Sequence, residues 1–300
     1  MGTADRPLIA LVYDASAESG GGHRVRTEAL AQALVEKVGG RAQACSIEQL
    51  AEVAPDLVLA DLYRPKSLHG LRGPWLLVCL DDESELEFDC DLLINPNLNE
   101  EFTHRTSART RYLRGGEYLL LRTQFQGQGA HPIQKTLEKL LLCFGGSDPA
   151  DLMARMAEWL SPSEFEITAV LGGLRSHWPV LPASWCVQRD VANMAVLMRE
   201  ADLGIFAAGT LLYEAAACGL PSLVVSVTEA QAREARAAVR TNAVFDLGPG
   251  ASLTRDALLA ALSRYRDRSL RQVLSMNAQR LVDPIGCRRI IGEIAALWGR

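Results

Sequence analysis

The sequence lacks the features that would place it in several common classes of protein. No apolar run approaches the roughly 20 residues that a membrane-spanning helix needs. The net charge is −5 at pH 7 and the isoelectric point is about 5.6, whereas a general nucleic-acid binder is usually basic. We therefore expect no stable membrane insertion and no nucleic-acid partner.

Cysteine and histidine are present, but without the spacing that disulfide frameworks and metal sites require. The seven cysteines are far apart, and none forms a Cys-x-x-Cys pair. Cys79 and Cys143 lie inside apolar runs typical of buried strands, so we expect reduced, buried thiols. The five histidines show no metal-ligand spacing. The sequence thus predicts neither a metal nor a cofactor.

Several sequence motifs are missing as well. No Gly-Lys-Ser/Thr follows a glycine turn, the first glycine run lacks the GxGxxG spacing, and no serine lies within GxSxG. These absences argue against a kinase, a dehydrogenase and a serine hydrolase. The first apolar run, Leu8–Tyr13, is shorter than the about 7–15 residues of a signal peptide core, and Asp14 follows it. We therefore expect a cytoplasmic protein.

The chain does have a repeated alternation of apolar runs and helical patterns. It has 300 residues, 48% of them hydrophobic, which is enough for two domains. Near-continuous apolar strands between helices indicate a parallel sheet buried on both faces. In the first half, strands are predicted at Leu8–Tyr13, Arg41–Ser46, Leu57–Ala60, Trp75–Leu80 and Leu92–Asn95, and helices at about His23–Lys37 and Ile47–Val53.

The pattern restarts after Thr123–Lys135, a polar, glycine-containing segment typical of a linker. The sequence therefore predicts an α/β fold of two Rossmann-like domains facing each other across a cleft. The N-terminal domain spans 1–130 and the C-terminal domain 131–300, with last helices that can pack back on the first domain. In the second half, strands are predicted at Leu140–Phe144, Glu166–Leu171, Trp185–Val187, Leu203–Phe206 and Ser222–Val227, and closing helices at Ala257–Arg264, Ser269–Arg280 and Cys287–Trp298.

A glycine loop follows the first predicted strand and leads directly into a helix. It contains Gly20, Gly21 and Gly22, and His23 and Arg26 follow at once. A strand, a glycine loop and a helix N-terminus in sequence can hold an anion or a reacting group. The loop alone leaves a plain turn with a surface histidine open as the alternative.

Two further glycine turns follow strands of the second half. In Gly145-Gly146-Ser147-Asp148-Pro149, Ser147 or Asp148 can cap the next helix and Pro149 suits its first turn. In the other turn, Thr210 follows Gly209 as a candidate helix cap, and Glu214 lies one turn later on the same face. A carboxylate there can accept hydrogen bonds from the hydroxyls of a ribose. The alternative for Glu214 is a solvated helical glutamate.

Polar residues also collect where the first-half strands end. Loops at the carboxyl ends of parallel strands form the binding crevice of an open α/β sheet, so these residues indicate a lined site. Each aspartate taken singly is typical of a turn or a helix cap. The residues are Asp14, Asp61 with Tyr63, Asp81 with Asp82, and Asn95 with Asn97.

An ordered set of motifs is specific enough to name a family. Over residues 8–235 the chain resembles the UDP-2,4-diacetamido-2,4,6-trideoxy-β-L-altropyranose hydrolase of pseudaminic acid biosynthesis and the related predicted glycosyltransferases of spore-coat polysaccharide synthesis. The motifs are Gly20-x-Gly22-His23-x-x-Arg26, Asp81-Asp82, Cys90-Asp91-Leu92-Leu93-Ile94-Asn95-x-Asn97, Leu121-Arg122-x-x-Phe125, Gly145-Gly146-Ser147-Asp148-Pro149 and Glu214 followed by Gly219-Leu220-Pro221-Ser222.

The resemblance implies a GT-B fold whose C-terminal domain holds most of the nucleotide. It implies an inverting hydrolysis, in which water attacks the anomeric carbon of a UDP-linked sugar. Thr210 and the N–H groups after Gly209 match the diphosphate-binding turn, and Glu214 matches the ribose-binding acid.

In the N-terminal domain, His23 matches the family histidine proposed to activate or position the water. A neutral imidazole can accept a proton, and the helix N-terminus with Arg24 and Arg26 is expected to lower its pKa. Asp61 and Tyr63 match family residues that line the sugar side.

Four positions depart from the family pattern. Ala208 stands where a second glycine is usual before the Ser/Thr pair. Leu211 stands where a hydroxyl is expected near the diphosphate, Ala230 replaces a polar residue near the sugar, and Tyr213 stands where tryptophan is usual. These departures leave the sugar open.

The leading hypothesis is a UDP-sugar hydrolase acting on an acetamido deoxy sugar. The alternatives are a GT-B glycosyltransferase that uses a UDP-sugar donor, and a non-catalytic nucleotide-sugar-binding protein. The candidate catalytic residue is His23, and the candidate substrate-binding residues are Gly20, Gly21, Gly22, Arg26, Asp61, Tyr63, Asp81, Gly145, Gly146, Ser147, Gly209, Thr210, Glu214 and Gln231.

Overall fold

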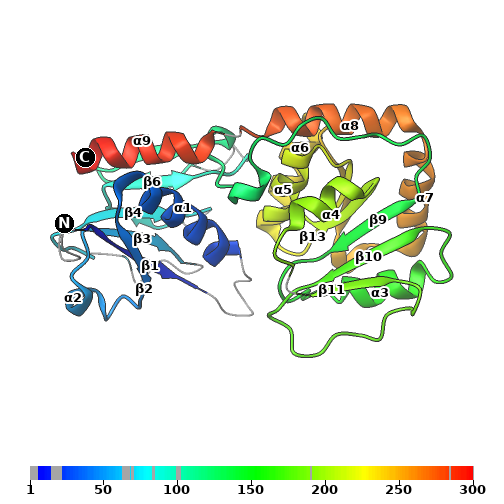
Figure 1. Cartoon of the computed structure of the whole chain (residues 1–300), viewed down its shortest axis with the longest axis horizontal. Coiled ribbons are helices and arrows are strands. Elements are labelled where there is room, and N and C mark those ends of the chain that lie inside the picture. Colours follow the sequence, from blue (N-terminus) through cyan, green and yellow to red (C-terminus); the bar gives the residue numbers. More distant parts are fainter. Residues whose placement is uncertain are drawn as a thin grey trace. The chain divides into compact units, whose positions relative to one another are not determined.

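The computed structural model describes residues 6–14, 22–62, 68, 71–82, 85–98, 103–189, 191–283 and 285–299. The chain divides into two compact units, Met1–Thr123 with Asp283–Arg300, and Gln124–Val282 (Figure 1). Each unit contains a six-stranded sheet whose neighbouring strands are all parallel. The prediction of two Rossmann-like parallel sheets is confirmed, and the cleft between them stays a prediction.

The first unit has the strand order β2-β1-β3-β4-β6-β8. A separate pair, β5 with β7, lies outside this sheet. The elements are β1 (Leu8–Tyr13), α1 (Gly22–Val38), β2 (Arg41–Ala44), α2 (Leu50–Val53), β3 (Leu57–Asp61), β4 (Leu76–Leu80), β5 (Glu87–Phe88), β6 (Leu92–Asn95), β7 (Arg105–Thr106), β8 (Arg111–Arg114), the 3-10 turn η3 (Gly116–Tyr118) and α9 (Gly286–Trp298). A second 3-10 turn, η4 (Thr123–Phe125), spans the boundary to the other unit.

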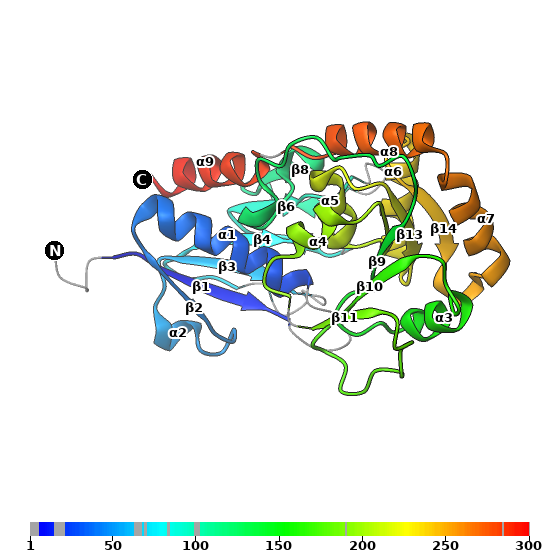
Figure 2. The ribbon, with the colours of Figure 1, turned by 45° about the vertical axis from the view of Figure 1, so that its right-hand side comes forward.

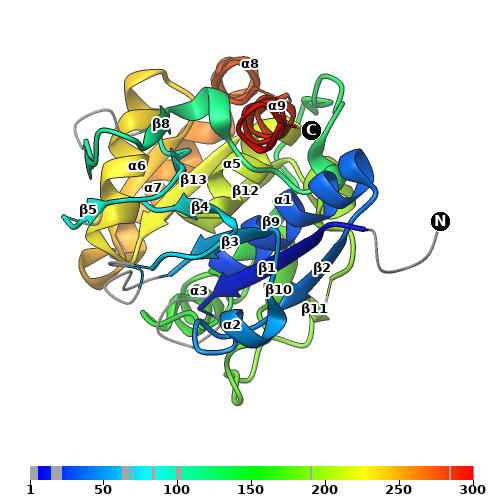
Figure 3. The same ribbon diagram turned by 90° about the vertical axis from the view of Figure 1, so that its left-hand side faces the viewer.

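Helices α1 and α9 pack side by side on one face of this sheet (Figure 3). Leu30 and Leu34 of α1, and Ile290 and Ile294 of α9, are fully buried there. The spacing of four residues in each helix places these side chains on one stripe, which explains why both helices form against the sheet. Gly286 starts α9 at close range, since a Cβ there would lie 2.6 Å from the carbonyl oxygen of Leu119.

The second unit has the strand order β11-β10-β9-β12-β13-β14 (Figure 2). Leu142 and Ile205 of the sheet share one core with side chains of α3, α7 and α8. Among the described residues, no helix has the length and apolar character to cross a membrane. The elements are β9 (Lys139–Cys143), α3 (Leu152–Trp159), β10 (Glu166–Leu171), β11 (Cys186–Arg189), α4 (Met194–Glu200), β12 (Leu203–Ala207), α5 (Thr210–Cys218), β13 (Ser222–Ser226), α6 (Glu229–Arg240), β14 (Phe245–Pro249), η5 (Gly250–Ser252), α7 (Arg255–Tyr265) and α8 (Arg268–Leu281).

The strand orders fix where a ligand can bind in each unit. In the first sheet the order in which successive strands are added reverses between β1 and β3, and in the second sheet it reverses between β9 and β12. The strands themselves remain parallel. Loops at such a reversal diverge to opposite faces, which leaves an opening at the carboxyl ends of the two strands. The carboxyl ends of β1, β3, β9 and β12, which the candidate loops follow in sequence, therefore all lie at these points.

The boundary between the units lies at Thr123 and not at residue 130. Gln124 already belongs to the second unit, because its side-chain amide donates to Ala192 O at 3.4 Å and accepts from Ala195 N at 3.2 Å. Gly129 O likewise accepts from Arg199 of the second unit at 2.9 Å. The polar composition of the linker concealed these anchoring contacts.

Four strands were absent from the sequence prediction, namely the short pair β5 and β7 and the two strands β8 and β14, each of which occupies an edge of a six-stranded sheet. β8 has arginine at both ends and buries only Leu113 of its four residues. β14 contains Gly248, with φ +83°, and Pro249. Glycine and proline are disfavoured inside strands and tolerated at edges, so composition did not mark this segment as a strand.

Buried His131 gives a prediction for the second unit. Its Nε2–H donates to Ala201 O at 3.0 Å, and burial lowers its pKa by more than this hydrogen bond raises it. The unfolded chain therefore binds this proton more readily, and stability is lost as the pH falls below the ordinary histidine pKa of about 6.5. We expect His131→Gln to lose less stability than wild type between pH 7.5 and 5.5, measured by urea unfolding.

The comparison between variants cancels the contribution of histidines that are the same in both proteins. An equal loss in both proteins would contradict the assignment.

Candidate functional site

The first candidate site joins the start of α1 to the end of β3. His23 lies in the first turn of α1, and Asp61 is the last residue of β3. His23 Nδ1 lies 2.6 Å from Asp61 Oδ1. Gly22 is the first residue of the helix, while Gly20, Gly21 and Tyr63 lie outside the described residues. The structure thus brings together two of the predicted site residues at the strand reversal.

Asp61 is a buried carboxylate that α1 holds by four contacts in all. Arg26 donates from Nε to Oδ2 at 2.5 Å and from Nη2 to Oδ1 at 2.7 Å, and Thr27 donates to Oδ2 at 3.3 Å. Burial alone would raise the pKa of Asp61, but the charge and hydrogen bonds of Arg26, with those of His23, lower it overall. Asp61 therefore remains ionised although its side chain is 0% exposed.

This ionised acceptor fixes the tautomer of His23. A carboxylate can only accept hydrogen bonds, so Nδ1 carries the hydrogen and donates it to Asp61. In the neutral ring the lone pair is then on Nε2, which can take a proton from a reacting group.

The expectation of a lowered pKa for His23 is wrong. Burial and the charge of Arg26 do lower it, but the hydrogen bond to Asp61 and the negative charges of Asp61 and Asp82 raise it by more. The sequence showed the arginines beside His23 in the chain and did not show the carboxylate that folding brings against it.

Arg26 also reaches a second carboxylate, at the end of β4. Its Nη1 donates to Asp82 Oδ1 at 2.6 Å. The backbone carbonyl of Asp82 accepts from Asn95 Nδ2 at 3.0 Å, which ties the ends of β4 and β6 together. Arg26 was expected to bind substrate, and here it positions the carboxylates of Asp61 and Asp82.

Asp81 belongs to a separate buried cluster. His104 Nε2 lies 2.6 Å from Asp81 Oδ1, and His104 Nδ1 lies 2.8 Å from the hydroxyl of Tyr112. Sequence reasoning missed His104, since it lies on no motif and the loop leading to it has no regular period. Asp81 was expected to bind substrate, and in the structure one of its oxygens accepts from this imidazole.

In the second unit, the glycine turn after β9 carries a carboxylate that accepts hydrogen bonds from the start of α3. Asp148 Oδ1 and Oδ2 accept from Leu152 N at 2.9 Å and Met153 N at 2.8 Å, so Asp148 caps α3 as predicted. The helix begins at Leu152, which corrects the placement of Pro149 in its first turn. The N-terminus of α3 is thus occupied by a carboxylate of the same chain.

Gly145, Gly146 and Ser147 form the turn before this cap, and their contact with substrate stays a prediction. Gly145 has a φ of +82°, a conformation that glycine adopts readily. The loop after β10 passes so close that a Cβ on Gly172 would lie 2.4 Å from Gly145 O.

The glycine turn after β12 differs, because no side chain caps α5. Thr210 is the first helical residue and Gly209 the cap position, so the prediction that Thr210 caps the helix is wrong. Gly209 has no side chain that could accept from the first N–H groups of α5, and among these groups Leu212 N donates to the backbone carbonyl of Gly209 at 2.9 Å. With the partial positive charge of the helix end, they form a place for an anion.

Gln231 lies beside this turn and is oriented by the backbone. The side-chain Oε1 of Gln231 accepts from Val227 N at 3.0 Å. The backbone N–H of Gln231 donates to Thr228 Oγ1 at 3.2 Å at the start of α6. Its Nε2 would lie 3.5 Å from a Cβ on Gly209. The side-chain amide thus presents its N–H donors toward the start of α5.

Glu214 lies in the second turn of α5 and is 3% exposed. The reading as a solvated helical glutamate is therefore wrong. Its neighbour Tyr213 donates a hydrogen bond to buried Glu234, which joins α5 to α6.

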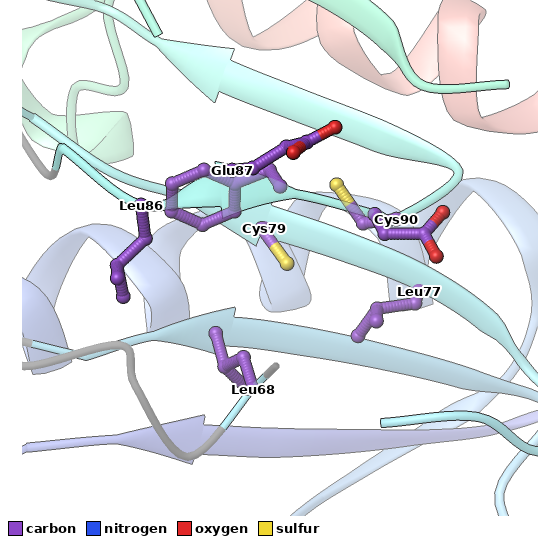
Figure 4. Close-up of a pocket in the computed structure, with 8 residues that line it drawn as sticks. Leu68, Leu77, Cys79, Leu86, Glu87 and Cys90 are labelled. Carbon is purple, nitrogen blue, oxygen red and sulfur yellow. The ribbon is translucent and has the colours of Figure 1, made fainter. Parts of the chain in front are cut away.

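A small apolar cavity lies elsewhere in the first unit (Figure 4). It measures about 10 Å³, the space of about one water molecule, so it cannot hold a sugar. Leu77, Cys79 and Cys90 are among its lining residues, and none of the predicted site residues lines it. Within the described ranges, no group of three His, Cys, Asp or Glu side chains is arranged to hold a metal ion.

The Asp61 contacts lead to a prediction about His23. Asp61→Asn removes the charge that raises the pKa of His23, so this pKa should fall below the wild-type value. NMR titration of the His23 ring measures it. Asp61→Ala should also cost about 3–5 kcal/mol of stability, since it leaves the buried Arg26 without its main partner.

Asp89→Asn is the matched control. Asp89 accepts a hydrogen bond from the guanidinium of Arg109 at 2.6 Å and is not among the charges that act on His23. An unchanged His23 titration in Asp61→Asn would contradict the role given to Asp61.

Comparison with known proteins gives sequence relatives of moderate similarity. No family model matches the chain. It is 28% identical over 203 residues to the spore coat polysaccharide biosynthesis protein SpsG of Bacillus subtilis, covering 64% of this chain and 60% of that protein. It is 25% identical over 273 residues to an uncharacterized protein of Methanocaldococcus jannaschii, and the match covers 74% of this chain and 56% of that protein. The chain thus spans less than two thirds of the length of these relatives.

Solved structures match over nearly the whole chain. CalG4, the calicheamicin glycosyltransferase, has a TM-score of 0.64 at 14% identity and covers 99% of each chain. MurG of Acinetobacter baumannii has a TM-score of 0.62 at 14% identity, covering 97% and 99%. A putative UDP-N-acetylglucosamine 2-epimerase of Listeria monocytogenes has a TM-score of 0.63 at 14% identity, covering 97% and 96%. The chain therefore has the GT-B fold of the glycosyltransferases.

Proposed function

We propose that the protein is a nucleotide-sugar hydrolase, which cleaves the anomeric C–O bond of a UDP-linked acetamido deoxy sugar to give UDP and free sugar. The structural observation that carries the proposed proton transfer is the His23–Asp61 pair, held at 2.6 Å in the first unit. The resemblance of the motifs supports water as the nucleophile. A histidine oriented by a buried carboxylate is an arrangement suited to removing a proton from a nucleophile.

The proposed reaction begins with a water at His23 Nε2. As the water oxygen attacks the anomeric carbon, its proton passes to Nε2, and the ring becomes an imidazolium. Asp61 stabilises this charge through the hydrogen bond at Nδ1. Arg26 keeps Asp61 ionised, so Asp61 does not itself take the proton.

The second unit is assigned the nucleotide. When the anomeric C–O bond breaks, its electron pair stays with the diphosphate oxygen, so negative charge grows on the diphosphate. The uncapped N–H groups of α5 and the Gln231 amide can donate to these oxygens and stabilise the leaving group. Glu214 is assigned to the ribose, whose hydroxyls can donate to its carboxylate.

The second candidate function is a glycosyltransferase that uses the same donor. It is favoured by the matched structures, since CalG4 is named a glycosyltransferase. The His23–Asp61 pair would serve an acceptor hydroxyl as well as a water, so the choice of hydrolase rests on the family resemblance of the motifs. SpsG, whose name refers to polysaccharide biosynthesis, is compatible with both functions.

A panel of UDP-sugars incubated with the protein alone separates these functions. Release of UDP and free sugar in equal amounts supports the hydrolase. Release only on addition of an acceptor identifies a transferase. Binding without turnover of any donor identifies a nucleotide-sugar-binding protein, in which Leu211 and Ala230 replace polar groups of the active family members.

For the hydrolase we expect His23→Ala to lower turnover by about 10²–10⁴, as is typical of losing a general base. UDP affinity, measured by calorimetry, should remain nearly unchanged. His177→Ala is the control, because His177 is exposed in the second unit. Wild-type turnover in His23→Ala would exclude the catalytic role.

A second variant tests the anion site on α5. Thr210→Glu puts a negative charge in the first turn of the helix, where it stabilises the fold by about 0.3–1 kcal/mol. The same charge repels a diphosphate, so UDP affinity should fall by at least about tenfold. Thermal unfolding and calorimetry together show whether stability and affinity change in opposite directions.

Ser269→Glu places the same charge in the first turn of α8 and should leave UDP binding unchanged. Equal affinity of wild type and Thr210→Glu would remove α5 from the nucleotide site.

A further inference from the structure

The carboxylates that share Arg26 differ in their access to solvent. Asp61 is 0% exposed and Arg26 12% exposed, whereas the side chain of Asp82 is 33% exposed. Only one of its oxygens, Oδ1, accepts from Arg26. A carboxylate has about four acceptor positions, so Asp82 keeps acceptor capacity on its exposed side.

Asp82 is also fixed in position more firmly than an ordinary surface acid. Arg26 orients its carboxylate, and the side-chain amide of Asn95, itself 3% exposed, donates to its backbone carbonyl at 3.0 Å. Such restraint lowers the entropy lost when a ligand hydrogen-bonds to the side chain.

The third observation is the distance from the proposed base. The guanidinium of Arg26 contacts Asp82 through Nη1 at 2.6 Å, and its Nη2 lies 3.4 Å from His23 Nδ1. Asp82 and the Nδ1 side of the His23 ring therefore lie against the same guanidinium group. A sugar that binds at His23 and extends along this group toward Asp82 can place a ring substituent on its carboxylate.

The charge of the cluster limits which substituents fit. Arg26 contributes one positive charge, and Asp61 and Asp82 contribute two negative charges, so the cluster is negative when His23 is neutral. A hydroxyl or amide N–H can donate to Asp82, whereas a carboxylate on the sugar would be repelled.

We infer that Asp82 is a specificity-determining residue, which accepts a hydrogen bond from a hydroxyl or amide N–H of the sugar and disfavours sugar acids. The inference rests on the proposed function, because it places the sugar beside His23. It adds the residue that selects neutral sugars with a donor group over sugar acids.

The test compares Asp82→Asn with wild type on UDP-N-acetylglucosamine, UDP-glucuronate and UDP alone. The asparagine keeps an oxygen for Arg26 and removes the charge. We expect the preference for the neutral donor over the sugar acid to fall by about tenfold to a hundredfold, in line with hydrogen bonds to charged groups. Affinity for UDP alone should not change.

Asp89→Asn is again the matched control, since Asp89 is an arginine-paired acid with a 38% exposed side chain. It should leave the preference unchanged. A preference equal to wild type in Asp82→Asn overturns the inference, even if the pH dependence of turnover shifts, because Asp82 would then act only through Arg26 and His23.

Calorimetry separates this inference from the proposed function. The ratio of the two donor affinities is measured without turnover. If wild type binds both donors and hydrolyses neither, the hydrolase is wrong, and a changed affinity ratio in Asp82→Asn still supports the contact to the sugar. An unchanged ratio overturns the contact whether or not the protein is a hydrolase.

Discussion

The ionised state of one buried carboxylate, Asp61, governs the chemistry of the first unit. A carboxyl group with no exposed surface would take up a proton unless cations and donors surrounded it. Arg26 supplies the charge and His23 a donor, and both come from successive turns of α1. The same contacts dock the helix start against the end of β3. Folding of the site and selection of the imidazole tautomer are therefore one event.

The two glycine turns of the second unit have similar sequences, but the helices that follow them are capped differently. After β9, Asp148 fills the helix N-terminus with its own carboxylate. After β12, the cap position is Gly209, which has no side chain to accept a hydrogen bond from the start of α5. A backbone anion site persists only where the protein leaves it unfilled, so composition alone does not distinguish the turns.

Much of the fold could be predicted because it depends on local patterns. Apolar runs such as Leu57–Ala60 and Leu140–Phe144 fall within or beside observed strands, since burial on both faces demands continuous apolar residues. Of the site, the sequence located His23 and Asp61 but not the contact between them. His23 and Asp61 are 38 residues apart in the sequence, and Asp81 and His104 are 23 residues apart. Such pairings depend on side-chain direction after the sheet has formed, which periodicity does not encode.

The return of α9 to the first unit has a consequence for synthesis of the chain. Ile290 and Ile294 complete the apolar core beneath α1, yet all of Gln124–Val282 is translated before them. While the ribosome makes the second unit, one face of the first sheet therefore remains without part of its cover. The core of the first unit is complete only when α9, which follows the whole second unit in the chain, has joined it.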